Sequence, residues 1–306
     1  MMRAMSDADE TLGFFRRYAS MLRGALPAQP AFAPTSESAT GVQVERGVVF
    51  ACALTSRGAN LKPYVDRLLE LSGSDRLPSL AIIDQGAHHR PAYRPLLVYA
   101  WLQAFRLVYE TLPRSDFGRW EEGLRPWCDL LEAELGDLAW PHGAMPAALG
   151  GSAAEAAWTA LALHVAGKVY VRDAWVDLAS HTFGKLIKNQ QPRGTFLETL
   201  PSDSPEAHWY HELVILHAAA SYAVQAEDRT LAGAVARNAE FHLNETQPDH
   251  ATSQPWALFA FAWNPSTRGL ADQILHAAHV SQPAGLDGVS LMLLADALYC
   301  FELFTG

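Results

Sequence analysis

Two kinds of helix alternate along this 306-residue chain, and this alternation limits its fold more than any other feature. Five segments are apolar on nearly every side of a helix, and they span 92–112, 152–168, 206–226, 253–263 and 287–304. A helix that is apolar all round has to be covered by protein on both sides. The partner segments are amphipathic, as helices with one solvent-facing side are, and they span 116–135, 172–189, 228–244 and 266–279. The pattern therefore predicts an inner and an outer layer of helices.

Apolar spacing, capping residues and Gly/Pro breaks predict three further helices near the start of the chain. They lie near 8–25, 42–56 and 60–72, and the second of them is also compatible with a strand. The twelve helices together suggest six helical hairpins. We expect an N-terminal helix and a Pro/Ala-rich segment over residues 1–40, followed by a single domain over 41–306.

The loops between the predicted helices alternate in length. A short connection follows each inner helix, whereas long connections lead from an outer helix to the next inner one, at 73–91, 136–151, 190–205, 245–252 and 280–286. In a ring of hairpins all the long connections fall on one rim. Long loops on a rigid scaffold commonly carry function, so we expect the functional site on that rim.

Composition excludes several classes of protein. The 49% of apolar residues and 18% of charged residues are typical of a chain with a sizeable core. A net charge of −10 without a basic run argues against a nucleic-acid partner. We expect no membrane span, because no uncharged apolar segment is long enough. The absence of a signal-peptide pattern, and the three distant cysteines Cys52, Cys128 and Cys300, favour a cytoplasmic protein with reduced, buried thiols.

The segment QQPRGTF, from Gln190 to Phe196, reads Q-x3-G-x-F. It resembles the QxxxGxW repeat of terpenoid cyclases and a similar loop of unsaturated-glucuronyl hydrolases. Together with the helix pattern, it makes the chain resemble the α/α-toroids, the six-hairpin fold of many glycosidases and polysaccharide lyases. The resemblance implies an all-α (α/α)6 toroid, a double ring of hairpins around a central cavity. In such folds the motif mainly ties a helix end to the next hairpin.

The start of the segment 206–226 crowds His208, Tyr210, His211 and Glu212 together. Positions three and four apart share a helix face, so the two histidines and Glu212 are expected to point towards the cavity. A histidine paired with a carboxylate is a suitable general base, because its ordinary pKa lies near neutrality. We therefore expect His208 or His211 as the base, Tyr210 as the acid and Glu212 as the orienting carboxylate.

Other polar and aromatic residues of the long loops are expected to line a substrate site. Aromatic platforms and carboxylates are what saccharide sites use, and the candidates are Trp140, His142, Glu198, Asp203, Asp249, His250 and Trp256. The two aspartates also suit turns or helix caps, and the two tryptophans also suit the core. His164 and His217 lie inside helices and are expected to be buried and hydrogen-bonded.

No cofactor is predicted, although His208, His211 and His250 belong to a residue type that binds divalent metals such as zinc. The hypothesis is a carbohydrate-active enzyme, either a lyase or a glycoside hydrolase, that acts on a small or oligomeric saccharide. One alternative is a terpenoid-type cyclase or isomerase with an apolar substrate, but the chain lacks the acidic DxDD and DDxxD motifs that such enzymes need. The other alternative is a non-catalytic toroid that binds a protein partner.

Overall fold

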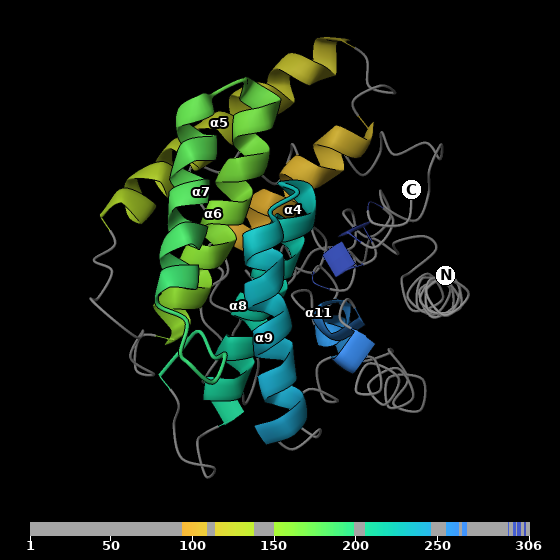
Figure 1. Cartoon of the computed structure of the whole chain (residues 1–306). Coiled ribbons are helices and arrows are strands. Elements are labelled where there is room, and N and C mark those ends of the chain that lie inside the picture. Colours follow the sequence, from red (N-terminus) through yellow and green to blue (C-terminus); the bar gives the residue numbers. More distant parts are fainter. Residues whose placement is uncertain are drawn as a thin grey trace.

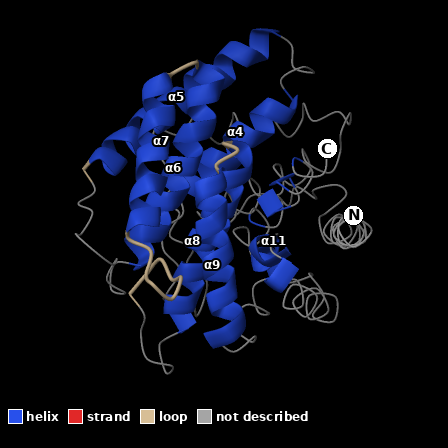
Figure 2. Cartoon of the chain, viewed as in Figure 1, coloured by secondary structure: helices blue, strands red, loops and turns tan. Residues whose placement is uncertain are grey.

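The computed structural model describes residues 94–108, 114–137, 150–198, 206–245, 255–262 and 265–267, together with residues 293, 296, 297, 299, 300 and 303. Most of these residues are helical, and no strand is assigned among them (Figure 2). The all-α class is therefore confirmed for this part of the chain. The closed double ring of six hairpins stays a prediction.

The described helices follow the predicted order closely (Figure 1). The bounds of α4 to α9 differ from the predicted ones by four residues or fewer. They are α4 (Arg94–Val108), α5 (Arg114–Gly136), α6 (Gly150–Tyr170), α7 (Asp173–Lys188), α8 (Glu206–Gln225) and α9 (Arg229–Glu245), followed by the short 3-10 helix η2 (Pro255–Ala257), α11 (Leu258–Ala262) and the 3-10 helix η3 (Pro265–Thr267).

Some predictions fall wholly or partly outside the described residues. The expected helices near 8–25, 42–56 and 60–72 lie outside them, and so does most of 266–279. The expected helix over 287–304 is described at six positions, all of them helical. Cys128 and Cys300 are buried free thiols, as predicted, whereas Cys52 lies outside the described residues.

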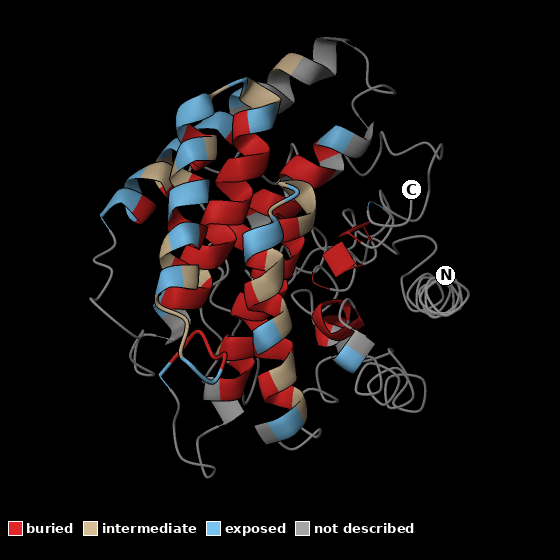
Figure 3. Ribbon diagram, viewed as in Figure 1, coloured by how far each residue is buried: buried red, intermediate tan, exposed pale blue. Residues whose placement is uncertain are grey.

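Helix α6 lies at the centre of the described helices and contacts α4, α5, α7 and α8. Its residues from Ala156 to Gly167 are all buried, because neighbours cover it on every side (Figure 3). This confirms the inner position predicted from its unbroken apolar sequence. Despite that apolar character, none of the described helices is both long and apolar enough to cross a membrane.

Helix α7 shows the opposite pattern and lies outside α6. Its buried residues recur at three- and four-residue spacing, which places them on one stripe, and they are Trp175, Ala179, Thr182, Phe183 and Leu186. Gly167 allows the two helices to approach closely, since a Cβ there would lie 2.6 Å from Cγ2 of Val176. Inner and outer helices thus pair as the sequence pattern predicts.

Two hairpin turns repeat the same backbone geometry. Val171 lies between α6 and α7 with a φ of 54°, and Glu227 lies between α8 and α9 with a φ of 55°. The amide of the following residue closes each turn: Arg172 N–H donates to the Gly167 carbonyl at 2.8 Å, and Asp228 N–H donates to the Ala223 carbonyl at 2.9 Å. This is the Schellman-type helix ending, whose left-handed position is usually glycine. The repeat supports a chain built from similar hairpins.

Val171→Gly is expected to raise the free energy of unfolding by about 1 kcal/mol, because a β-branched residue is strained in the left-handed region. The side chain is 86% exposed, so little packing is lost. Urea unfolding at constant pH measures the change. Ala236→Gly, inside α9, is the matched control and should lower stability by roughly 0.5–1 kcal/mol. A Val171→Gly protein no more stable than the native one would contradict strain at this turn.

Candidate functional site

The start of α8 places the expected catalytic residues in different surroundings. Tyr210 is buried and His211 is half-buried, and their ring centroids lie 6.2 Å apart. Tyr210 also meets the edge of buried Trp256, with centroids 6.0 Å apart. Glu212 is fully buried. His208 belongs to α8, but its side chain lies outside the described residues. The structure therefore brings Tyr210, His211 and Trp256 together.

The other residues expected to line the site are only partly described. Glu198 is exposed at the end of the loop that follows α7. The remaining predictions lie outside the described residues, and they are Trp140, His142, Asp203, Asp249 and His250. The suggested metal ligands His208 and His250 are thus not placed. Within the described part of the chain, no three His, Cys, Asp or Glu side chains are grouped as metal ligands.

The carboxylate of Glu212 holds the loop that carries the Q-x3-G-x-F motif. Its Oε1 accepts hydrogen bonds from Phe196 N–H and Asn238 Nδ2, both at 2.6 Å, and its Oε2 accepts one from Leu197 N–H at 3.0 Å. Burial raises the pKa of Glu212 to about 7, although the three hydrogen bonds act in the opposite direction. The geometry gives this residue a role in joining the loop to α8 and α9.

The motif residues fix the same loop from the other side. Gln190 Nε2 donates to the carbonyls of Gly194 at 2.7 Å and Ala234 at 2.8 Å. Gly194 has a φ of 108°, and a Cβ there would lie 2.5 Å from the Arg237 carbonyl oxygen, so no other residue fits. The motif therefore ties the end of α7 to α9, which is the role that the resemblance implied.

A second polar cluster lies buried halfway along α8. His217 Nε2 lies 3.0 Å from Oδ2 of Asp296, and Ser221 Oγ donates to the same oxygen at 2.5 Å. The Tyr99 hydroxyl donates to Oδ1 of Asp296. All four side chains are fully buried. This central cluster was not predicted, because its two most distant members are 197 residues apart in the sequence.

Aromatic rings enclose His217. The Trp158 ring stacks on it with centroids 5.8 Å apart, and the Trp256 ring meets it edge-on at the same distance. His217 Nδ1 has no hydrogen-bond partner among the described residues. His217 is thus buried and bonded at one nitrogen, close to expectation. His164 is also buried, as expected, and the backbone of Gln225 is within hydrogen-bonding reach of its ring.

Each of the five predicted inner segments contributes at least one residue to this cluster or to the rings around it. The contributors, in chain order, are Tyr99, Trp158, His217, Trp256 and Asp296. Such convergence is what an inner layer of helices around a common axis would produce. This convergence supports the division into inner and outer helices. The side chains of the cluster fill the space between the inner helices at this level.

Hydrogen bonds of two glutamines, Gln103 and Gln225, extend the central cluster towards the ends of the helices. Gln103 Nε2 donates to the Tyr99 hydroxyl and to Oε1 of Gln225, both at 2.9 Å. Gln225 Nε2 donates to the same hydroxyl at 2.8 Å. Arg106 in turn donates to Oε1 of Gln103 at 3.1 Å. Gln225 and Arg106 both line a pocket, so hydrogen bonds connect that pocket to the buried carboxylate.

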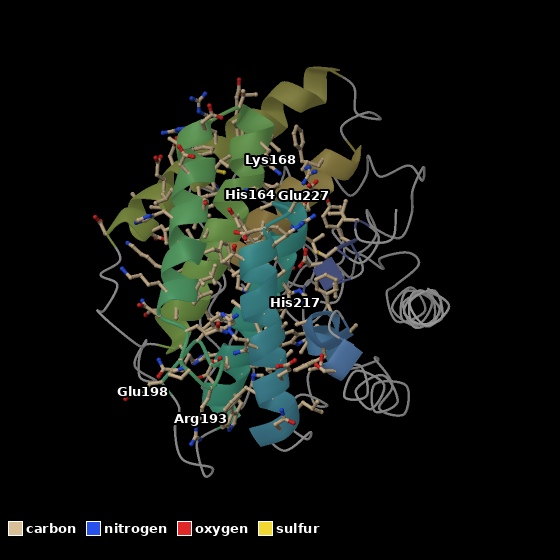
Figure 4. All side chains as sticks on the ribbon, in the orientation of Figure 1. His164, Lys168, Arg193, Glu198, His217 and Glu227 are labelled. Atoms are coloured by element: carbon tan, nitrogen blue, oxygen red, sulfur yellow. The ribbon has the colours of Figure 1, made fainter. Side chains whose placement is uncertain are left out.

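This pocket has a volume of about 510 Å³ and lies where α4, α6 and α8 end and α9 begins. Its charged and hydrogen-bonding lining includes Arg106, Lys168, Gln225, Glu227, Arg229 and Tyr299. Lys168 and Glu227 are at this end of the helices, while Arg193 and Glu198 are at the other (Figure 4). Sequence reasoning placed the site at the opposite end. The available signal was a basic residue in the last turn of two otherwise apolar inner helices, Arg106 and Lys168.

Burial shifts the pKa values of several groups in and beside the pocket. Burial and the positive charge of Arg106 lower the pKa of Lys168, while the negative charge of Glu227 acts in the opposite direction. Lys168 Nζ donates to the Gln225 carbonyl at 3.0 Å. Burial raises the pKa of Tyr299 to about 12 and lowers that of nearby His164 to about 4. At neutral pH the pocket therefore offers a phenol that keeps its proton and an amine that loses its proton more readily than usual.

Comparison of the chain with protein-family models, with curated proteins and with solved structures finds no match.

Proposed function

We propose that the protein is an enzyme that cleaves a small acidic saccharide by β-elimination in the pocket at the ends of α4, α6 and α8. The observation that carries this proposal is the set of three cations around a cavity of about 510 Å³. That volume suits a molecule of one to a few sugar rings, because small-molecule sites span roughly 300–1,000 Å³.

The charge of the pocket points to an acidic substrate. Lys and Arg make up three of the eleven lining residues, compared with 23 of the 306 residues in the chain. Concentrating cations in one place on a chain of net charge −10 favours an anionic group such as a uronate carboxylate. A terpenoid substrate would instead need a dry, apolar cavity.

The choice between elimination and hydrolysis rests on the carboxylates. Hydrolysis needs two carboxyl groups that flank the scissile bond. The pocket has Glu227 and Asp228, but Asp228 caps α9 by accepting the amides of Thr230 at 2.9 Å and Leu231 at 3.0 Å. Among the described lining residues, Glu227 is therefore the one carboxylate that accepts no hydrogen bond, which disfavours hydrolysis.

Elimination uses groups that the pocket does contain. The arginines neutralise the uronate carboxylate, which makes the proton on the neighbouring carbon more acidic. Lys168, in its unprotonated form, takes that proton, a carbon–carbon double bond forms, and the bond to the leaving oxygen breaks with its electron pair. Tyr299 gives its proton to the leaving oxygen. Proton exchange with water then returns Lys168 and Tyr299 to their starting states.

Lys168→Met is expected to lower kcat by about 10²- to 10⁴-fold on a uronate-containing oligosaccharide, because it removes the base. Arg229→Gln should mainly raise KM, because it removes a contact with the carboxylate. The readout is the absorbance of the unsaturated product at fixed ionic strength. Lys188→Met, an exposed change on α7, is the matched control and should leave the rate unchanged.

A further variant tests which end of α8 carries the reaction. The helix has 20 residues, so its ends lie about 30 Å apart and His211 does not reach the pocket. Loss of activity in a folded His211→Ala protein, together with normal activity in Lys168→Met, would move the chemistry to the long-loop end predicted from the sequence. Absence of an unsaturated product on all acidic saccharides would overturn the proposed reaction.

A further inference from the structure

Of the two carboxylates in the described pocket lining, that of Glu227 accepts no hydrogen bond. Its neighbour Asp228 accepts two backbone amides at the start of α9. The Glu227 side chain makes no hydrogen bond or ion pair of standard length with any described residue, although it lines the pocket. Lys168 Nζ donates to the Gln225 carbonyl, while the nearby charge of Glu227 acts to raise the pKa of Lys168. A free carboxylate beside three cations gives the pocket groups of both signs.

The backbone at Glu227 has a conformation that is unusual for a residue other than glycine. Glu227 occupies the left-handed position of the turn, with a φ of 55°, where glycine is the favoured residue. Its side chain leaves this turn at the pocket, beside Lys168 (Figure 4). Val171 holds the same position in the α6–α7 turn and does not line the pocket. The two turns thus share the same left-handed backbone conformation, and only the α8–α9 turn places a carboxylate at the pocket.

Resting on the proposed function, we propose that Glu227 binds a protonated amino group of the substrate, so that the pocket selects saccharides carrying both an acidic group and a free amine. The arginines hold the acidic group and Glu227 holds the ammonium. A carboxylate bonded to an ammonium is a charge-assisted pair, which is stronger than a bond to a neutral hydroxyl. Acetylation of the amine removes the charge and would remove this preference.

The test compares three ligands by titration calorimetry: glucuronic acid, 2-amino-2-deoxyglucuronic acid and its N-acetyl derivative. The native protein should bind the free amine at least about tenfold more tightly than the N-acetyl form. Glu227→Gln should abolish that ratio and leave the affinity for glucuronic acid nearly unchanged. Val171→Gly is the matched control and should keep the full ratio.

Glu227→Gly adds a second, independent readout. Like Val171→Gly, it should make the protein more stable to urea, but it should also lose the preference for the amine. Equal binding of the amine and the N-acetyl form by the native protein would overturn the role of Glu227 while glucuronic acid binding still supports the proposed function. No binding of any of the three acidic sugars would overturn both proposals.

Discussion

Glu212→Ala should lower the free energy of unfolding by about 3–5 kcal/mol, the largest loss that we expect from a single side chain at the loop end of α8. Removing the carboxylate leaves the buried amides of Phe196 and Leu197 and the Asn238 side chain without their acceptor. Buried donors without partners are costly because water no longer solvates them. Urea unfolding followed by far-ultraviolet circular dichroism measures the loss.

Glu198→Ala provides the matched control, since Glu198 belongs to the same loop but is exposed. It should change stability by no more than about 0.5 kcal/mol. If Glu212→Ala lost as little as this control, the loop would not depend on the buried carboxylate. If the alanine protein failed to fold, Glu212→Gln would still test the idea, because it keeps Oε1 and disturbs only the contact with Leu197.

The pH dependence of stability gives a second readout of the same carboxylate. The pKa of Glu212 is raised in the folded protein from 4.5 to about 7, so the folded state binds the proton more tightly than the unfolded state. Its contribution to stability is therefore greatest below pH 4.5 and falls as the pH rises to about 7. Relative to Glu212→Gln, the native protein should lose about 3 kcal/mol across this window. Parallel pH profiles would show that the three hydrogen bonds keep Glu212 ionised throughout.

Asp296→Asn is expected to cost a similar amount, about 3–5 kcal/mol, because it breaks the central cluster from within. The fully buried carboxylate accepts hydrogen bonds from Tyr99, Ser221 and His217. An amide nitrogen at either oxygen position would face a donor instead of accepting from it. Equilibrium unfolding in urea gives the change.

Two further variants define the scale of this loss. Ser221→Ala removes one of the hydrogen bonds to Asp296 and should cost about 1–2 kcal/mol. Asp177→Asn, on the exposed side of α7, should change stability by less than about 0.5 kcal/mol. An Asp296→Asn protein as stable as the Asp177→Asn protein would show that the cluster does not need its negative charge.

Helix positions could be predicted here because they depend on local spacing. The stripe of α7, from Trp175 to Leu186, repeats at three and four residues, and the uniformly apolar sequence of α6 can only be buried. The identity of each buried partner could not be predicted. Asp296 lies 79 residues from His217 and 75 from Ser221, and no local pattern encodes such a contact.

The pocket lies at the end of the helices opposite to the predicted site, and the sequence alone could not indicate it, for a similar physical reason. A glutamate in the first turn of a helix, such as Glu212, is favoured by the helix dipole wherever its side chain points. Basic residues in a last turn, such as Arg106 and Lys168, complement the same dipole whether or not they line a cavity. Only the packing of α4, α6 and α8 shows which of these charges surround open space.

The bond between Tyr99 and Asp296 also constrains the order in which the chain can fold. A contact across 197 residues closes a very long loop, so its entropy cost is met only after the intervening helices have packed. If the preceding helices pack during synthesis, Tyr99, Ser221 and His217 come together before the residue that joins them has been made. Until residue 296 is available, this interior lacks the carboxylate that accepts from these groups, and we expect the incomplete protein to be most prone to aggregation in that interval.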